Sequence, residues 1–160
     1  MMFKVSDYSG SREENYLLVF RQLESLLHGE TNRIANLANA SALLNQFLPE
    51  INWVGFYLLQ GEELVLGPFQ GLPACVRIPL GKGVCGTAAQ KKETIRVEDV
   101  HQFPGHIACD AASRSEMVIP MIKNGGVIGV LDIDSPVKNR FDHIDQRHLE
   151  KFVEILVKHW

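Results

Sequence analysis

Three cysteines, Cys75, Cys85 and Cys109, are the residues of this chain whose chemistry depends most on their surroundings. Free cysteine is often a small buried residue, so position must decide between packing and reactivity. Cys85 follows a glycine-rich turn at residues 81–83 and opens a short predicted helix, where a lowered thiol pKa and simple packing fit equally well. Cys109 lies in a polar loop, residues 106–110, where core packing is harder to invoke, so the sequence favours a functional thiol there.

A zinc site is the first alternative for these thiols. Zinc sites usually take pairs of ligands from tight turns such as C-x2-C. The chain has one close pair, His106 and Cys109, and the other two cysteines are too far apart in sequence to supply a second. The sequence therefore predicts no metal site. His106 has two open roles, since it could tune the Cys109 thiolate or simply be solvated.

Carboxylates form the second chemical feature. Asp132 and Asp134 flank Ile133 at the end of an apolar run, and residues two apart on a strand face the same side. Glu116 opens the preceding predicted strand and would lie close to them across a hairpin. Carboxylates gathered on one face of a strand destabilise the fold unless they are solvated, paired with cations or employed in binding or catalysis. Three of them suit a cationic group such as an ammonium, and one with a raised pKa could deliver a proton. The alternative is that the strand ends in a turn before Pro136.

Apolar spacing predicts the elements that position these groups. A helix is expected from a cap at Ser11, with Glu14 three residues on, to a stop at Gly29, and a second one from residues 30–31 to before residue 49. The expected apolar faces hold Tyr16, Leu17, Phe20, Leu23 and Leu27 in the first helix, and Ile34, Leu37, Ala38, Leu44 and Phe47 in the second.

Beyond residue 50 the pattern changes to short strands. They are expected at residues 53–59, 64–66, 74–78, 94–97, 116–122 and 127–134, with a short helix at 84–91. Residues 67–71 are expected to form a loop, and residues 99–113 a long loop with at most one helical turn. Asp142 is expected to cap a closing helix. This order predicts an α+β fold, in which amphipathic terminal helices cover an antiparallel sheet with short helical crossovers.

Composition agrees with one globular domain of 160 residues. Hydrophobic residues make up 46% and charged residues 22%, which excludes a disordered tail, a collagen-like fibre and a coiled coil. The net charge of -3 makes the chain a poor general binder of nucleic acid. We expect no membrane span, since no apolar run approaches about 20 residues, and no secretory signal. These features, together with an odd number of cysteines, predict a cytoplasmic protein without a disulfide scaffold.

Five stretches closely resemble the free methionine-(R)-sulfoxide reductase family, single-domain enzymes built on the GAF fold: residues 51–57, 67–71, 83–86, 106–109 and 129–135. The resemblance is strongest over about residues 30–158 and includes all three cysteines and the acidic positions. It implies a single GAF-like domain over residues 1–160, with a central six-stranded antiparallel sheet and helices on both faces.

The resemblance also implies roles for individual residues. Cys109 would be the nucleophile, Cys75 the usual resolving partner, and Cys85 a thiol that can join or relay the disulfide. Trp53 would wall the pocket around the substrate methyl group. The free amino acid would be held by three acids, Glu116, Asp132 and Asp134. Of these, Glu116 and Asp134 are the candidates for assisting protonation.

The implied reaction is the reduction of free L-methionine-(R)-sulfoxide to methionine. A cysteine sulfenic acid would form and condense with Cys75 or Cys85 to an intramolecular disulfide, which thioredoxin would reduce. No metal or organic cofactor is expected, and the resemblance is compatible with a homodimer. The alternative is a GAF module that senses a small ligand without catalysis, with Trp53 lining the ligand pocket and the cysteines serving as packing or as an attachment point for a tetrapyrrole.

Overall fold

The computed structural model describes residues 3–107 and 109–160 as four α-helices, six strands and one 3-10 turn. The helices are α1 (Arg12–Leu27), α2 (Arg33–Phe47), α3 (Gly83–Lys91) and α4 (His143–Lys158), and the 3-10 turn is η1 (Val100–Gln102). The strands are β1 (Trp53–Gln60), β2 (Glu63–Gly71), β3 (Arg77–Pro79), β4 (Ile95–Val97), β5 (Ser115–Lys123) and β6 (Gly126–Ser135). None of the helices in the described ranges is long and apolar enough to cross a membrane.

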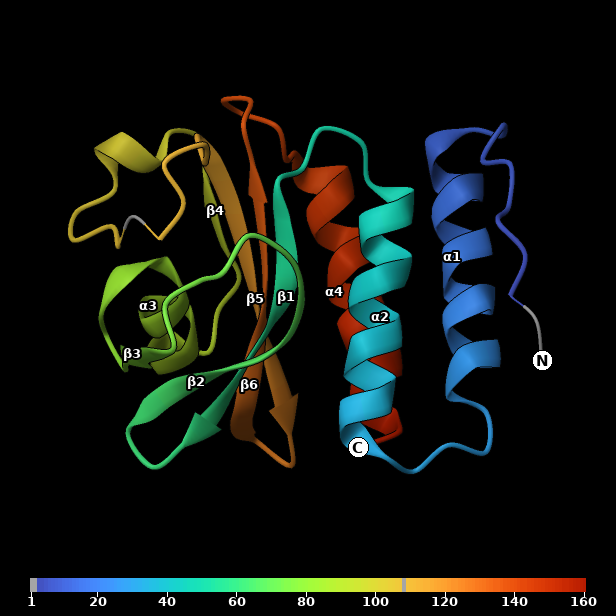
Figure 1. Ribbon diagram of the computed structural model, residues 1–160, viewed down its shortest axis with the longest axis horizontal. Helices are drawn as coiled ribbons and strands as arrows, with labels where there is room; N and C mark the ends of the chain where they lie inside the picture. The colour runs from blue at the N-terminus through green and yellow to red at the C-terminus, as the bar shows by residue number, and fades with distance from the viewer. Residues whose placement is uncertain (1–2, 108) are drawn as a thin grey trace.

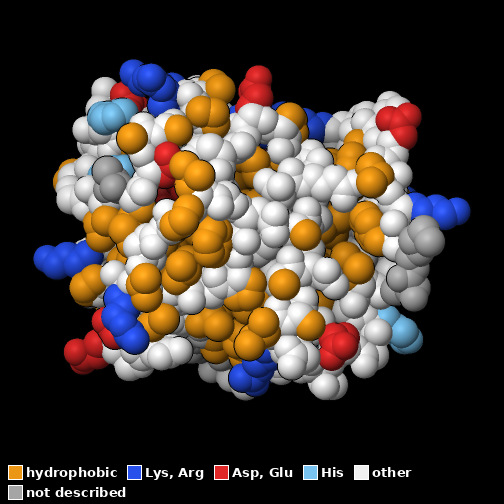
Figure 2. Space-filling view, in the orientation of Figure 1, with side chains coloured by type: hydrophobic (Ala, Val, Ile, Leu, Met, Phe, Trp, Pro, Cys, Tyr) orange, Lys and Arg blue, Asp and Glu red, His pale blue; other side chains and the backbone are white. Residues whose placement is uncertain are grey.

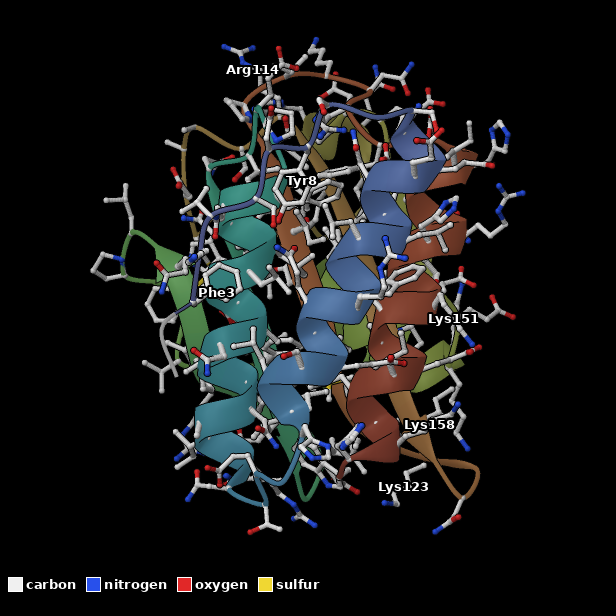
Figure 3. All side chains as sticks on the ribbon, turned by 90° about the vertical axis from the view of Figure 1, so that its right-hand side faces the viewer. Phe3, Tyr8, Arg114, Lys123, Lys151 and Lys158 are labelled. Carbon is white, nitrogen blue, oxygen red and sulfur yellow. A yellow bond between two sulfur atoms is a disulfide. The ribbon has the colours of Figure 1, made fainter. Side chains whose placement is uncertain are left out.

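All six strands form one antiparallel sheet in the order β3-β2-β1-β6-β5-β4. Figure 1 shows four layers from left to right: α3 with the long loop around η1, the sheet, then α2 with α4, and finally α1. Figure 3, seen from the right-hand side of Figure 1, shows α1 lying across the outside of α2 and α4. The expected α+β fold with helices on both faces of a six-stranded sheet is thus confirmed.

The alternation of side chains along the central strands separates two interiors. On β1, Val54 and Phe56 enter the main apolar core beneath α2 and α4, while Trp53 and Tyr57 enter a smaller cluster beneath α3. This follows from the two-residue period of a strand, whose successive side chains point to opposite faces. The α3 face is therefore supplied by every second residue of β1, β5 and β6.

Side-chain caps fix where the helices begin. The Ser11 hydroxyl accepts a hydrogen bond from the Glu14 backbone amide at 3.2 Å, as the sequence predicted. The second helix was expected from residues 30–31 but begins at Arg33, because the Asn32 side chain accepts from the Ala35 amide at 3.0 Å. The closing helix begins after its predicted cap, Asp142.

The predicted apolar faces of the first two helices were wrong at three positions. Leu17, Ile34 and Ala38 are exposed, and Ile34 keeps 70% of its surface accessible. The reason is that α1 packs mainly on two helices, and that α2 buries Ala40 and Leu43 beside the correctly predicted Leu37 and Leu44. Helical spacing alone does not tell which of two neighbouring stripes meets the core.

Two strand predictions were also wrong. Residues 67–71, expected to be a loop, complete β2, because they pair with β1 as far as Trp53 opposite Gly71. Residues 67 and 68 lie opposite Phe56 alone, so the Gly-Pro pair that suggested a loop forms a bulge within the strand. The strand expected at 74–78 is shorter and later, over Arg77–Pro79.

Candidate active site

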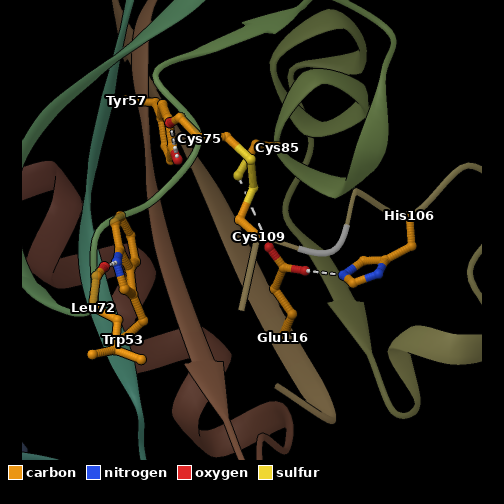
Figure 4. The surroundings of a disulfide bond; sticks show 8 residues. All are labelled: Trp53, Tyr57, Leu72, Cys75, Cys85, His106, Cys109 and Glu116. Carbon is orange, nitrogen blue, oxygen red and sulfur yellow. Dashed lines mark hydrogen bonds and ion pairs between the residues drawn. A yellow bond between two sulfur atoms is a disulfide. The ribbon is translucent and has the colours of Figure 1, made fainter. Parts of the chain in front are cut away.

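A pocket opens on the α3 face of the sheet. Its lining comes from β1, β5, β6, the segment before β3, the start of α3 and the loop after η1. The chemistry-bearing residues around it are Trp53, Tyr57, Cys85, His106, Cys109, Asp110, Glu116, Asp132 and Asp134. All the site residues expected from the sequence line this pocket except Cys75, which is bonded to Cys109 of the lining (Figure 4).

Two of the three cysteines form a disulfide. Cys75, before β3, is bonded to Cys109, in the loop after η1, with their Cα atoms 5.7 Å apart. That separation lies within the range that a disulfide spans without backbone movement. Cys85 stays a free, buried thiol in the first turn of α3, beside the pair in Figure 4. The sequence left Cys75 and Cys85 as competing partners of Cys109, and the structure pairs Cys109 with Cys75.

Buried aromatic residues of β1 hold the Cys75 segment in place. The Tyr57 hydroxyl donates to the Cys75 carbonyl at 2.8 Å, and the Trp53 indole N–H donates to the Leu72 carbonyl at 3.1 Å. The Trp53 ring is stacked with those of Tyr57 and Phe69, at centroid distances of 5.9 and 5.1 Å. Trp53 is thus a rigid apolar wall, and Tyr57, whose positioning role the sequence did not reveal, fixes the backbone beside the thiol.

The Cys109 loop is tethered from the other side. The Asn52 side-chain amide donates to Asp110 Oδ2 at 2.9 Å and to Ser113 Oγ at 3.1 Å. Sequence reasoning missed these three residues as positioning groups. In the sequence, Asn52 stands next to Trp53 and Asp110 stands next to Cys109. This adjacency was the only sequence signal for them, and it does not reveal a contact between residues 58 positions apart.

The three acids converge as predicted. Glu116 on β5 lies directly opposite Asp134 on β6, and Asp132 follows two residues away on the same face. The alternative, in which the strand has ended before the two aspartates, is wrong, because Asp132 and Asp134 both lie within β6. Glu116 and Asp132 are buried, whereas Asp134 is partly exposed at the pocket.

Burial sets the protonation of this group. Desolvation, reinforced by the charge of Asp134, raises the pKa of Glu116 to about 8. Desolvation followed by repulsion from Glu116 raises the pKa of Asp132 well above its usual range, and desolvation followed by Asp132 does the same for Asp134. Glu116 is therefore a proton donor near neutral pH, so the site can supply a proton to a bound ligand.

The other titratable neighbours are also affected by burial. It raises the pKa of the Cys85 thiol, with Asp132 adding to the effect, and it lowers the pKa of His106. Cys85 Sγ lies 3.9 Å from Glu116 Oε1, and His106 Nε2 lies 3.7 Å from Glu116 Oε2. His106 thus faces an acid of the pocket, and its side chain keeps only 16% of its surface accessible.

Comparisons with known proteins agree with this geometry. The model of the GAF domain family matches residues 22–159. Curated relatives include the free methionine-R-sulfoxide reductase of Escherichia coli, 54% identical over 92% of this chain and 90% of the relative, and the enzyme of the same name from Saccharomyces cerevisiae, 46% identical over 92% and 87%.

Solved structures give the same result. The reduced form of fRMsr from Staphylococcus aureus is 54% identical, covers 99% of both chains and superposes with a TM-score of 0.88. The free methionine-R-sulfoxide reductase of Neisseria meningitidis in complex with its substrate is 44% identical over 99% of this chain and 95% of that chain, with a TM-score of 0.94.

Proposed function

The chain belongs to the GAF domain family and, within it, to the free methionine-R-sulfoxide reductases, and from that membership we propose that it reduces free L-methionine-(R)-sulfoxide to methionine. The observation that carries the proposal is a cysteine pair able to form a disulfide at the mouth of a pocket that holds three acids. The chemistry needs two electrons and two protons, which two thiols can supply. It therefore requires no metal or organic cofactor.

Cys109 is the proposed nucleophile. Its thiolate attacks the sulfoxide sulfur, and the sulfoxide oxygen takes a proton from Glu116 or Asp134. Methionine leaves, and the oxygen remains on Cys109 as a sulfenic acid. The Cys75 thiol then condenses with the sulfenic acid, releasing water and forming the Cys75–Cys109 disulfide. Cys85 acts as a reserve thiol that can relay the disulfide.

Substrate recognition rests on the same pocket. Trp53 offers a stacked apolar surface for the methyl group on sulfur. Asp132 and its acidic neighbours receive the ammonium group of the free amino acid, and Asp132 Oδ1 is buried with no hydrogen-bond partner in the described part of the chain. A peptide-bound residue lacks that ammonium, so the acids select the free amino acid.

A thioredoxin-type dithiol is the proposed reductant. Three exposed aliphatic side chains, Leu72, Val76 and Ile107, flank the two disulfide cysteines and are here named the apolar rim. Figure 2 shows hydrophobic side chains gathered on this side of the molecule. Leu72 and Val76 keep 64% and 59% of their surfaces accessible although the backbone carbonyls of both residues are hydrogen-bonded. A partner with an apolar surface around its own dithiol fits such a rim.

The remaining assignments follow from the same chemistry. A disulfide that forms at every turnover has to be reduced again, which suits the reducing cytoplasm. We also assign the chain to a single GAF domain in which α1 forms the outer layer.

The direct test is a single turnover by the fully reduced protein, with free methionine-(R)-sulfoxide, the (S) epimer and a peptide containing methionine sulfoxide. We expect methionine from the free (R) epimer alone and none from a Cys109→Ser variant. Turnover of the peptide at an equal rate would contradict free-substrate recognition. No turnover of any substrate would contradict the enzymatic proposal and leave ligand sensing.

A further inference from the structure

A thiol and two carboxylates meet at the floor of the pocket. The sulfur of Cys85 and one carboxylate oxygen from each of Glu116 and Asp132 all lie within 4.8 Å of one another. They come from three different elements, α3, β5 and β6, so the fold and not a local motif brings them together. All three residues are buried, and each lines the pocket through which an ion would enter.

One atom of this cluster lacks a partner. Asp132 Oδ1 is buried and accepts no hydrogen bond from any described residue. A buried acceptor without a hydrogen-bond partner opposes folding, and more strongly when it is charged. An electropositive ligand would remove this unfavourable contribution. From these observations we propose that Cys85, Glu116 and Asp132 form a binding site for Zn²⁺, and that the bound ion excludes the substrate.

The donor set indicates which ion fits. Zinc accepts thiolate, carboxylate and imidazole ligands together, whereas Mg²⁺ and Ca²⁺ prefer oxygen donors alone. His106 Nε2, which lies 3.7 Å from the second oxygen of Glu116, is the neighbour placed to supply an imidazole, and water can fill a remaining position. Cys85 Sγ and Glu116 Oε1 lie 3.9 Å apart, slightly farther than two ligand atoms of a tetrahedral zinc ion, so binding draws these two side chains together.

Binding of the ion also changes the proton balance of the cluster. The protonated thiol and carboxyls would lose their protons to make room for a divalent cation, and the released protons make the affinity rise with pH. The charged groups that face Cys85 are Glu116 and Asp132, with Asp134 adjacent on β6. Once these protons have left, the thiolate and the two carboxylates favour binding of a cation and not of an anion.

Zinc and substrate compete for the same acids. Glu116 and Asp132 are the groups assigned to the ammonium of the substrate, so only one of the two ligands can occupy them. This consequence rests on the proposed function, whereas binding of the ion does not. The site would make the enzyme sensitive to free zinc through a thiol that takes no part in the Cys75–Cys109 disulfide.

The test uses the disulfide form of the whole chain, in which Cys75 and Cys109 cannot ligate a metal. Calorimetric titration with zinc chloride is expected to show one site per chain. Cys85→Ser and Asp132→Asn are each expected to weaken it more than about a hundredfold, beyond the cost of losing an outer-shell partner. The matched control is His101→Gln, because His101 Nδ1 with Asp99 Oδ1, 3.1 Å away, is an exposed pair that could hold zinc at the surface.

A second measurement, cobalt(II) absorption, distinguishes loss of the site from a variant that fails to fold. Cobalt(II) added to the disulfide form is expected to give a thiolate-to-cobalt absorption band, which Asp132→Asn weakens and Cys85→Ser abolishes. Zinc affinity unchanged in both variants, or lost in His101→Gln, would overturn the site. In single-turnover assays with reduced protein, zinc inhibition is expected to be relieved by more substrate, and inhibition that substrate cannot relieve would overturn the exclusion. An inactive zinc-free protein would instead refute the proposed function and leave the binding result intact.

Discussion

On the face covered by α2 and α4, strands β5 and β6 present buried apolar side chains such as Met117 and Leu131. On the face covered by α3, the neighbouring positions of the same strands are Glu116 and Asp132. The two faces are therefore separated by one residue along each strand, yet one is a closed core and the other gathers acids around a thiol.

This difference shows how the fold accommodates a costly site. The apolar side chains of the α2–α4 face supply hydrophobic stabilisation, at roughly 25 cal/mol per Å² of buried apolar surface. The acids on the α3 face contribute the opposite sign, since desolvation without full pairing opposes folding. The acids and the main core thus lie on opposite faces of one sheet, and substitutions of the acids and of the main-core residues should act in opposite directions.

The largest expected effect compares two neighbouring residues of β6. Leu131→Ala on the core face should destabilise the protein by about 2–5 kcal/mol, because it removes a fully buried side chain and leaves a cavity. Asp132→Asn on the site face should be neutral or stabilising, since it replaces a buried acid that has an unpartnered oxygen. Urea unfolding of the disulfide form measures both. A loss of several kcal/mol in Asp132→Asn would break the comparison.

An intermediate effect comes from the pH dependence of Glu116. Its pKa rises from 4.5 to about 8 on folding, so the folded state holds a proton that the unfolded state has lost over that range. This proton stabilises the folded state fully below the unfolded pKa, and the stabilisation is lost as the pH rises to about 8. Glu116→Gln abolishes this loss of stability. The free energy of unfolding of the variant, relative to wild type, should therefore increase by at least about 1.4 kcal/mol between pH 5 and pH 8.5, the equivalent of one pKa unit. The measurement is thermal or urea unfolding at both pH values.

The control for this experiment is Glu62→Gln, an exposed glutamate in the β1–β2 turn. It should change stability equally at both pH values. If Glu116→Gln behaved in the same way as this surface variant, the carboxyl of Glu116 would not be the buried proton carrier described here.

The smallest expected effect concerns the apolar rim on the surface of the α3 side. Val76→Glu places a charge in the apolar rim and should lower kcat/KM for thioredoxin about tenfold, equivalent to about 1.4 kcal/mol of binding. The rate with dithiothreitol as reductant should not change, because Val76 is exposed and does not line the pocket. Val5→Glu is the matched control, since Val5 is 76% exposed in the N-terminal segment. Equal kcat/KM for all three proteins would exclude the rim as the docking surface.

The convergence of the acids was predictable from local rules, because strand periodicity and a short hairpin place them together. The disulfide partner was not, since Cys75 and Cys109 are 34 positions apart with four elements between them. The tether from Asn52 to Asp110 was hidden for the same reason. The end of β2 depends on pairing with β1, and the exposure of Ile34 depends on which stripe of α2 meets the sheet. Such properties arise from tertiary contacts, which override local propensity.

The central claim is that Cys109 reduces the substrate and Cys75 resolves the product. Reduced protein mixed with less than one equivalent of free methionine-(R)-sulfoxide, trapped with an alkylating reagent and mapped by peptide mass spectrometry, tests it most directly. We expect one Cys75–Cys109 disulfide for each methionine formed, with Cys85 alkylated. Methionine formed while Cys75 remains alkylated and Cys85 is joined to Cys109, or formed with Cys109 still a free thiol, would contradict it.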